Sequence, residues 1–510
     1  PQNLVENRIY SDHKTIVSSF KVNDKRAKDL KLETKIIKDE EGWNKWYELT
    51  HEIADKIIDQ LNEGKDGAKI IKFIEKTLKH TEHKAFKKIK QNKIKRKLTS
   101  DNEIFYKLTK ELETMEEDVA QLKDTNKIFK ARKDKIMAER GEELFAMFDK
   151  DGKMVESKEE ILKALSDYNE NLLNRREHDA NWREIFQMKQ DLMETLKETQ
   201  IKEYKTLSHE EFLKAMNKIR KKGKTLFQPL LKSSGSFQAV LFFVLRKIYE
   251  EETIPESFMK TELYPLYKKG DQRDPANYRF LHMKGMIARL FEAIIYVKIE
   301  EHLDRNTPET QMGGMKQGDT LEHLITIVSM MTAAEKAKES ICILFCDVRK
   351  MFDMCHLADT NSTLIRQGAD TKAVKLLHKI QENNKLNVKG STKTFCICGG
   401  EGQGNCVSGR RISLCLAEIT TRHSEKIPEE LVYKHRQQKI KNTGFVDDAA
   451  LYGKNAEGAK LNGKIYSEIL NEMALDAHPT KTVQVVIGHK KSIEKLKDDI
   501  KLDPTKVQGH

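Results

Sequence analysis

The clearest hydrophobic pattern in this chain is a pair of short apolar runs separated by charge. Phe445 and Val446 precede two adjacent acids, Asp447 and Asp448, and residues 449–452 are apolar again, with a glycine on either side of the whole stretch. Short apolar runs bounded by glycines are typical of buried strands joined by a tight turn. The pattern therefore predicts a hairpin whose tip carries both carboxylates.

A second apolar run ends on an acid about a hundred residues earlier. Residues 340–346 are almost continuously apolar, as in a strand covered on both faces, and Asp347 follows directly, with Asp353 shortly after. Neighbouring carboxylates in a buried position raise each other's pKa, and a divalent cation removes that repulsion. Carboxylates at the ends of two buried strands suit two-metal phosphoryl transfer, in which two Mg²⁺ lie about 3.5–4 Å apart. The alternative is an ordinary polar turn, which an isolated pair of acids usually marks.

The stretch from about residue 40 to residue 206 is helical in pattern and dense in charge. A basic run at residues 84–97 contains eight Lys or Arg. Such a run is usually a solvated helix face, and binding to a phosphate backbone is the open alternative. Apolar residues recur at helical spacing before it: Trp43, Trp46, Tyr47, Ile53, Ile57, Ile58 and Leu61, then Ile70, Ile71, Ile74 and Leu78.

Composition and net charge exclude few classes of protein. The 510 residues allow two or three domains, and a net charge of +12 with a pI of about 9.0 suits a polyanionic partner without identifying one. No apolar run approaches the roughly 18–20 residues of a membrane helix. All seven cysteines lie between Cys342 and Cys415 in spacings that offer no zinc pattern, which favours reduced, buried thiols.

Several motifs, in this order, resemble those of reverse transcriptases. Residues 347–353 resemble the first catalytic motif, residues 402–404 the glycine-rich motif that contacts template and incoming nucleotide, and residues 445–448 the F-x-D-D box. The set is similar to the polymerase region of non-LTR (LINE-type) retrotransposons of the apurinic-endonuclease class. The resemblance implies an α+β fold with the fingers and palm of a right-hand polymerase, an antiparallel palm sheet packed on helices, and a long α-helical linker before them.

The resemblance also implies a division of the chain into four parts. Residues 1–25 would be the remnant of an apurinic-type endonuclease C-terminal end, because an SDH triplet occupies residues 11–13. Residues 26–206 would be a charged helical linker, residues 207–490 the fingers and palm, and residues 491–510 the truncated start of a thumb. With almost the whole endonuclease missing, no nuclease activity is expected.

The motifs imply a role for each catalytic residue. Asp347, Asp447 and Asp448 would hold two Mg²⁺, or Mn²⁺ in their place, and the backbone carbonyl of Val348 would help. Lys481 lies in a segment that resembles the motif whose lysine protonates the departing pyrophosphate, which makes it the candidate general acid.

A second set of residues is implied on the nucleotide side. A lysine binds phosphate as a point charge and a guanidinium binds it bidentately, although simple surface charge is the alternative for the two lysines. A bulky ring excludes the ribose 2′-hydroxyl, and a core phenylalanine is compatible with that role. A glycine lets the backbone approach a nucleotide closely. The residues concerned are Lys268, Lys269, Arg279, Phe352, Gln403 and Gly404.

The implied function is RNA-directed DNA synthesis, in which a primer 3′-hydroxyl attacks the α-phosphate of a deoxynucleoside triphosphate. The implied partners are an RNA template, a DNA primer and deoxynucleotides, with no membrane. The family acts inside cells, in the cytoplasm as a ribonucleoprotein and in the nucleus for integration. The oligomeric state stays open.

A non-enzymatic alternative also stays open. A degenerate or co-opted copy would bind RNA or a partner protein without polymerising. Three departures from the family pattern favour it: a lost template-side turn at residues 222–229, Phe280 in place of a proline, and Gly314 in place of an aromatic residue. Retention of the three acids, Gln403 and Lys481 argues against it. A helical scaffold would leave the motifs unexplained.

Overall fold

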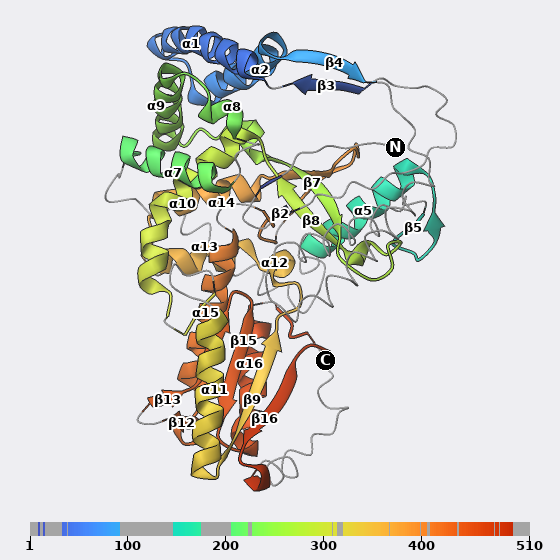
Figure 1. The fold of residues 1–510 in the computed structure, drawn as a ribbon, viewed down its shortest axis with the longest axis vertical. Coiled ribbons are helices and arrows are strands. Elements are labelled where there is room, and N and C mark those ends of the chain that lie inside the picture. The colour runs from blue at the N-terminus through green and yellow to red at the C-terminus, as the bar shows by residue number, and fades with distance from the viewer. Residues whose placement is uncertain are drawn as a thin grey trace, which may run out of the picture.

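We describe the protein from a computed structural model (Figure 1). The residues that it describes are 9–10, 14–15, 33–37, 39–91, 146–174, 206–222, 227–308, 310–313, 320–366, 368–397, 399–404, 408–435, 438–473, 475–478 and 480–492. The SDH triplet, residues 92–97 of the basic run, Gly314 and residues 223–226 of the lost turn lie outside the described residues.

A helical layer forms the upper part of Figure 1 around one hydrophobic core. Its helices are α1 (Glu40–Asn62), α2 (Gly67–Ala85), α7 (His209–Lys222), α8 (Gln228–Leu231), α9 (Gly235–Glu251), α10 (Met286–Asn306) and α14 (Thr371–Glu382). Ile57 of α1, Leu241 of α9 and Phe291 of α10 are fully buried in this core. The helices predicted before residue 206 therefore share their apolar interior with helices of the predicted fingers, although the predicted division at that residue is not tested by this packing.

Sequence signals set the ends of these helices. The Asp39 carboxylate caps α1 by accepting from the backbone N–H of Gly42 at 2.8 Å. Ser208 and Glu211 form a capping box at α7, in which the Ser208 N–H donates to the Glu211 carboxylate at 2.8 Å. A serine just before a helical pattern is the sequence signal for this helix start.

The helical prediction fails over part of the basic run. Lys87–Gln91 is a strand, β4, which pairs antiparallel with β3 (Glu33–Ile37). Its Lys88-Ile89-Lys90 sequence alternates in polarity, and pairing with a partner that contains Ile36 and Ile37 overrides a weak helical preference.

A mixed four-stranded sheet lies below the helical layer. Its order is β11 (Thr394–Cys396), β10 (Lys385–Val388), β7 (Lys260–Tyr267) and β8 (Tyr278–Met283). Only β10 and β7 run parallel. Helix α5 (Lys158–Leu173), which follows the hairpin of β5 (Met147–Phe148) and β6 (Met154–Val155), packs in one core with this sheet.

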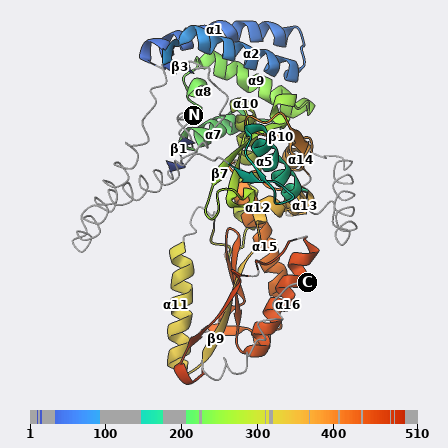
Figure 2. The ribbon, with the colours of Figure 1, turned by 90° about the vertical axis from the view of Figure 1, so that its right-hand side faces the viewer.

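The lower part contains the predicted palm sheet. Its order is β14 (Asn442–Phe445), β15 (Asp448–Gly453), β9 (Ser340–Asp347) and β16 (Val483–Gly488), and every pair is antiparallel. Helix α11 (Thr320–Ala337) covers one face, and α15 (Ser408–Lys426) and α16 (Ala456–Glu472) cover the other (Figure 2). The antiparallel sheet, the acid-tipped hairpin and the α+β class are as the sequence predicts.

Shorter elements complete the described chain. They are β1 (Ile9–Tyr10), β2 (Lys14–Thr15), β12 (Tyr433–His435), β13 (Gln438–Ile440), α12 (Met351–Met354), α13 (Leu357–Arg366), and the 3₁₀ turns η3 (Glu256–Met259), η4 (Pro275–Asn277) and η5 (Glu429–Leu431). Within the described part, no helix is both long and apolar enough to cross a membrane. The five described cysteines are unpaired thiols, and all except Cys396 are buried.

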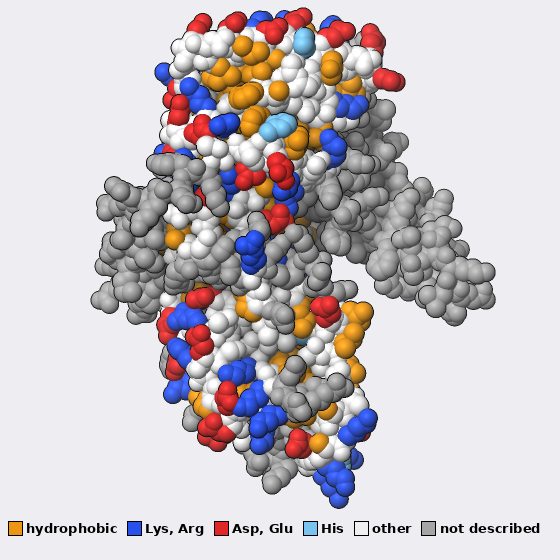
Figure 3. All heavy atoms as spheres, turned by 90° about the vertical axis from the view of Figure 1, so that its left-hand side faces the viewer, with side chains coloured by type: hydrophobic (Ala, Val, Ile, Leu, Met, Phe, Trp, Pro, Cys, Tyr) orange, Lys and Arg blue, Asp and Glu red, His pale blue; other side chains and the backbone are white. Residues whose placement is uncertain are grey.

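Apolar side chains also gather on the surface of the helical layer. Figure 3 shows them on the upper part of the face that carries α1, α7 and α9. The large exposed apolar residues of these helices are Tyr47, Ile58, Leu213 and Phe243.

Trp46 provides a test of whether α1 belongs to the same core. Its ring is 2% exposed and stacks on Phe86, and its indole N–H donates to the Pro229 carbonyl at 2.8 Å. Trp46→Ala should lower the free energy of unfolding by about 3–5 kcal/mol, because it leaves a large cavity. Urea denaturation followed by circular dichroism measures this change.

Tyr47→Ala is the matched control, because the neighbouring Tyr47 is 53% exposed. It should alter the free energy of unfolding by no more than about 0.5 kcal/mol. Equal effects of the two substitutions would mean that α1 does not pack as described.

Candidate active site

Strand register brings the predicted metal-binding acids to one end of the palm sheet. Asp448 begins β15 and lies directly opposite Asp347, the last residue of β9. Asp447 precedes Asp448 in the turn between β14 and β15. Directly opposed residues of an antiparallel pair have Cβ atoms about 4.5–5.5 Å apart, so two strands distant in sequence place their carboxylates side by side.

The turn that carries Asp447 is held in an unusual backbone conformation. Val446 has a φ of 58°, which is a rare value for a β-branched residue. The Gln311 side chain stabilises it: its Oε1 accepts from the Val446 N–H at 3.1 Å, while its Nε2 donates to the Ser413 carbonyl at 3.1 Å. Gly313 packs against the same turn, where a Cβ would lie 2.1 Å from the Val446 nitrogen. The Gln-x-Gly segment thus supports the acid-bearing turn.

The surroundings of Asp447 and Asp448 raise the pKa of both side chains. Partial burial raises the pKa of Asp448 to about 6, and the charges of Asp447 and Asp347 add to the effect. Burial also raises the pKa of Asp447, with a further contribution from Asp347, while Lys481 and Arg279 act in the opposite direction. Clustered carboxylates of this kind favour a bound cation.

Lys481 makes direct contact with this cluster. Its ammonium donates to Asp347 Oδ2 at 2.8 Å. The preceding segment is attached to the end of β9, since the His478 N–H donates to the Asp347 carbonyl at 2.7 Å and the Arg349 N–H donates to the Asp476 carbonyl at 2.8 Å. The candidate general acid is therefore held beside the first acid by backbone pairing.

The basic residues predicted to bind phosphate lie on the fingers sheet and face the acids. Lys268 directly follows β7, and Arg279 lies on the neighbouring strand β8. The pKa of Lys268 is lowered first by burial and then by the charges of Arg279, Lys481 and Lys269, with Asp347 acting in the opposite direction. These charged groups are therefore near enough to influence one another electrostatically.

The glycine-rich loop closes a third side of the site. The Gln403 amide donates to Asp353 Oδ1 at 3.2 Å, and the Gln403 carbonyl accepts from the His282 N–H of β8 at 2.9 Å. Gly404 has a φ of 101°, a backbone region that favours glycine. Phe352, half-buried in α12, accepts at its carbonyl from the Glu401 N–H at 2.6 Å.

A cleft of about 350 Å³ opens beside the acids, between α11 and the palm sheet. Leu324 and Ile327 of α11 line one side, and Asp347, Asp448 and Lys481 line the other. Most of the other lining residues are apolar, so the cleft is largely apolar and carries the charges of Asp347, Asp448 and Lys481.

The carboxylate oxygens of these acids are suitable ligands for a divalent cation that prefers oxygen. A bound cation would also relieve the repulsion that helps to raise the pKa of Asp447 and of Asp448. Asp347, Asp447 and Asp448 are the side chains that would hold it. Val348 is buried and forms an isolated bridge with Ala477, directly after Asp347. As the side chains lie, the described residues contain no group of three His, Cys, Asp or Glu arranged to enclose a metal ion.

Some supporting residues could not be singled out by motif alone. Gln311 contacts the hairpin turn, more than a hundred residues further along the chain. Lys350 Nζ donates to the hydroxyl of Tyr168 on α5, whose ring stacks on Phe280. The departure from proline to phenylalanine at residue 280 thus creates an aromatic pair with Tyr168.

Comparison with known proteins agrees with this geometry. The profile of the reverse transcriptase (RNA-dependent DNA polymerase) family matches residues 267–506. A protein named as a probable RNA-directed DNA polymerase from transposon X-element of Drosophila melanogaster is 31% identical over 121 residues, which are 23% of this chain and 13% of that protein.

Solved structures with a partial likeness include telomerase from Candida tropicalis. The form truncated from its C-terminal domain matches with a TM-score of 0.35 and 13% identity over 51% of this chain and 63% of that one. The apo form matches with a TM-score of 0.34 and 12% identity, over 46% of this chain and 44% of that one. A likeness this weak adds nothing to what the sheet topology shows.

Residues 267–506, just under half of the chain, therefore match the reverse transcriptase family, whose members are nucleotidyltransferases. This confirms the family predicted from the motifs, while the comparisons do not show the endonuclease part. Reverse transcriptase domains bind nucleic acid and nucleotides and generally use divalent metal ions. The individual roles of the site residues stay predictions.

The raised pKa values predict that the stabilising effect of magnesium depends on pH. The folded protein binds the Asp448 proton more tightly than the unfolded chain does. Repulsion in the metal-free protein is therefore present above pH 6 and relieved as the pH falls below it. Mg²⁺ should raise Tm clearly at about pH 7.5 and much less at about pH 5, where it must displace a proton. Differential scanning fluorimetry measures both shifts.

Asp448→Asn should remove most of the difference between the two pH values. Asp55→Asn, which alters an exposed acid of α1, should keep it. A shift of equal size at both pH values, or one that Asp448→Asn leaves intact, would argue against a cation site at these acids.

Proposed function

We propose that this chain contains the RNA-directed DNA polymerase region of a LINE-like retrotransposon. The observation that carries the proposal is the pairing of β15 with β9, which sets Asp448 opposite Asp347 beside Lys481. The match to the X-element protein supports the retrotransposon origin, and the chain spans 13% of that relative. The activity, substrates and partners of a whole element protein are therefore part of the proposal.

Binding of the incoming deoxynucleotide begins with its phosphates. Lys268, Lys269 and Arg279 form a basic group on the fingers sheet that faces the acids. Arg279 is exposed and binds phosphate oxygens bidentately, and the two lysines add point charges. These residues hold the α-phosphate between the fingers sheet and the acid cluster.

The acid cluster organises the chemical step. Asp347, Asp447 and Asp448 would hold two Mg²⁺, or Mn²⁺, and the Val348 carbonyl would assist. When bound, such ions activate the attacking 3′-oxygen and stabilise the leaving oxygen. The Lys481 ammonium, whose Nζ lies 2.8 Å from Asp347 Oδ2, gives a proton to the departing pyrophosphate once that ion pair is broken.

The remaining residues select and orient the substrates. The Phe352 ring excludes the 2′-hydroxyl of a ribonucleotide. Gln403 and Gly404 approach the base pair that is being formed, since the positive φ of Gly404 keeps the backbone free of a side chain there. The primer end occupies the cleft beside α11, whose largely apolar lining suits stacked nucleosides and also contains Asp347 and Asp448.

The proposal extends to partners and location. The template is RNA and the primer is DNA, and the positive net charge of the chain favours both. Activity takes place inside the cell, in a cytoplasmic ribonucleoprotein and at the nuclear integration site.

Primer extension tests the proposal. On an RNA template with a DNA primer, at low salt and with Mg²⁺, the wild-type chain should add deoxynucleotides. Asp447→Asn should reduce the rate by about 10²–10³-fold or more, because it removes a charge that stabilises the developing charge of the transition state.

Asp55→Asn, prepared in the same way, should extend the primer as the wild type does. Equal extension by Asp447→Asn and wild type would locate the activity elsewhere. No extension by wild type, with RNA binding retained, would favour the binding-only alternative.

A further inference from the structure

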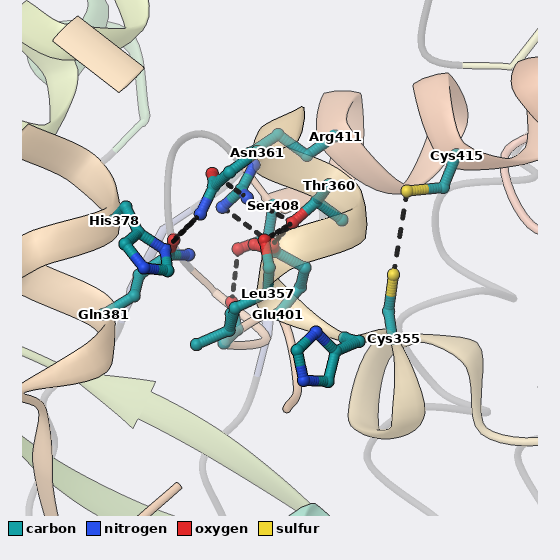
Figure 4. A network of polar contacts seen from close by, with 12 residues as sticks. Cys355, Leu357, Thr360, Asn361, His378, Gln381, Glu401, Ser408, Arg411 and Cys415 are labelled. Carbon is teal, nitrogen blue, oxygen red and sulfur yellow. Dashed lines mark hydrogen bonds and ion pairs between the residues drawn. The ribbon is translucent and has the colours of Figure 1, made fainter. Parts of the chain in front are cut away.

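Behind the glycine-rich loop lies a buried cluster of charged and polar side chains that the proposed chemistry does not use (Figure 4). Glu401 and Arg411 are 2% and 1% exposed, and Arg411 Nη1 lies 2.7 Å from Glu401 Oε1. Burial raises the pKa of Glu401, and the Arg411 charge opposes that shift. Removing two charges from water is costly, so a pair this deeply buried needs further partners.

Those partners come from two neighbouring helices. Arg411 Nη2 donates to Asn361 Oδ1 at 2.6 Å and also to the Thr360 hydroxyl, both on α13. The Thr360 hydroxyl in turn donates to Glu401 Oε1 at 3.2 Å. The Asn361 amide reaches the Gln381 side chain of α14 at 3.3 Å. The network thus joins the loop to α13, α14 and α15.

A second buried ion pair extends the cluster toward the fingers sheet. Lys284, which directly follows β8, donates to Glu292 of α10 at 2.7 Å, and both side chains are almost fully buried. A cavity of about 20 Å³, large enough for one water, is lined by both ion pairs. The two pairs therefore lie where the fingers sheet, the helical layer and the palm meet.

The Glu401 backbone connects this network to the nucleotide side. Its N–H donates to the carbonyl of Phe352 at 2.6 Å, and the adjacent Gly400 N–H donates to the Cys355 carbonyl at 2.8 Å. Two residues further on, Gln403 contacts Asp353. Fixing the Glu401 side chain therefore fixes the backbone that positions both the Phe352 ring and the Gln403 amide.

We propose that Glu401 and Arg411 are positioning residues for nucleotide selection. The pair holds the loop so that Phe352 keeps the distance at which its ring rejects ribonucleotides and Gln403 keeps its place beside the incoming base. The expected effect on nucleotide choice rests on the proposed polymerase function. The expected effect on the loop backbone rests on the described contacts alone.

The structural test is hydrogen exchange measured by mass spectrometry on the full chain without substrate. Arg411→Lys keeps the charge and the fold but loses the guanidinium bonds to Thr360 and Asn361. It should increase deuterium uptake at residues 399–404 at least about tenfold in rate and leave residues 442–453 unchanged. Lys218→Leu, which breaks a 2.7 Å ion pair to Glu300 in the helical layer, should change neither segment.

A double substitution separates positioning from mere stability. Glu401→Leu with Arg411→Leu replaces the ion pair by apolar groups, which commonly preserves stability. Its Tm should stay close to that of the wild type while the loop amides remain fast-exchanging. Wild-type protection of the loop in Arg411→Lys or in the double variant would overturn the proposal.

The kinetic test applies to nucleotide choice. Both variants should raise KM for deoxynucleotides more than they lower kcat. They should also reduce the ratio of kcat/KM for deoxy- over ribonucleotides about tenfold. An unchanged ratio in an active enzyme would overturn the proposal while the polymerase function stands. If the wild type does not polymerise, the hydrogen-exchange result alone decides it.

Discussion

The candidate site depends on the pairing of β15 with β9. That register places Asp448 opposite Asp347 and sets Asp447 at the adjoining turn, so three like charges meet at one sheet end. A shift of one residue would send the opposing side chains to the other face and disperse the cluster. The apolar residues of both strands, packed between α11 on one face and α15 and α16 on the other, oppose such a shift.

The turn and the loop are held by contacts from outside the sheet. Gln311 and Gly313 stabilise the positive φ of Val446, and no short-range sequence signal links them to a hairpin more than a hundred residues away. In the same way Tyr168 of α5 contacts Lys350, and the Glu401–Arg411 pair holds the glycine-rich loop. The site is therefore an assembly of the palm, the fingers and the preceding helix.

Much of this arrangement could be predicted from the sequence. The acid-tipped hairpin and β9 follow from apolar runs and glycines. The motifs also grouped Lys268, Arg279 and Lys481 with the acids. Long-range partners could not be predicted, because periodicity carries no information about which distant side chain approaches. Strand β4 shows where reasoning from local sequence fails. Its sequence has a weak helical preference, but pairing with β3 makes the segment a strand.

The central claim is that Asp347 and the hairpin acids form one cation site, and Mn²⁺ binding tests it most directly. Titration of the full chain with Mn²⁺ in the presence of a non-hydrolysable deoxynucleotide, followed by electron paramagnetic resonance, reports bound metal without requiring turnover. The account predicts saturable binding by the wild type that is lost in both Asp347→Asn and Asp447→Asn, although one residue ends β9 and the other lies in the turn before β15. Wild-type binding by either variant would contradict a shared site.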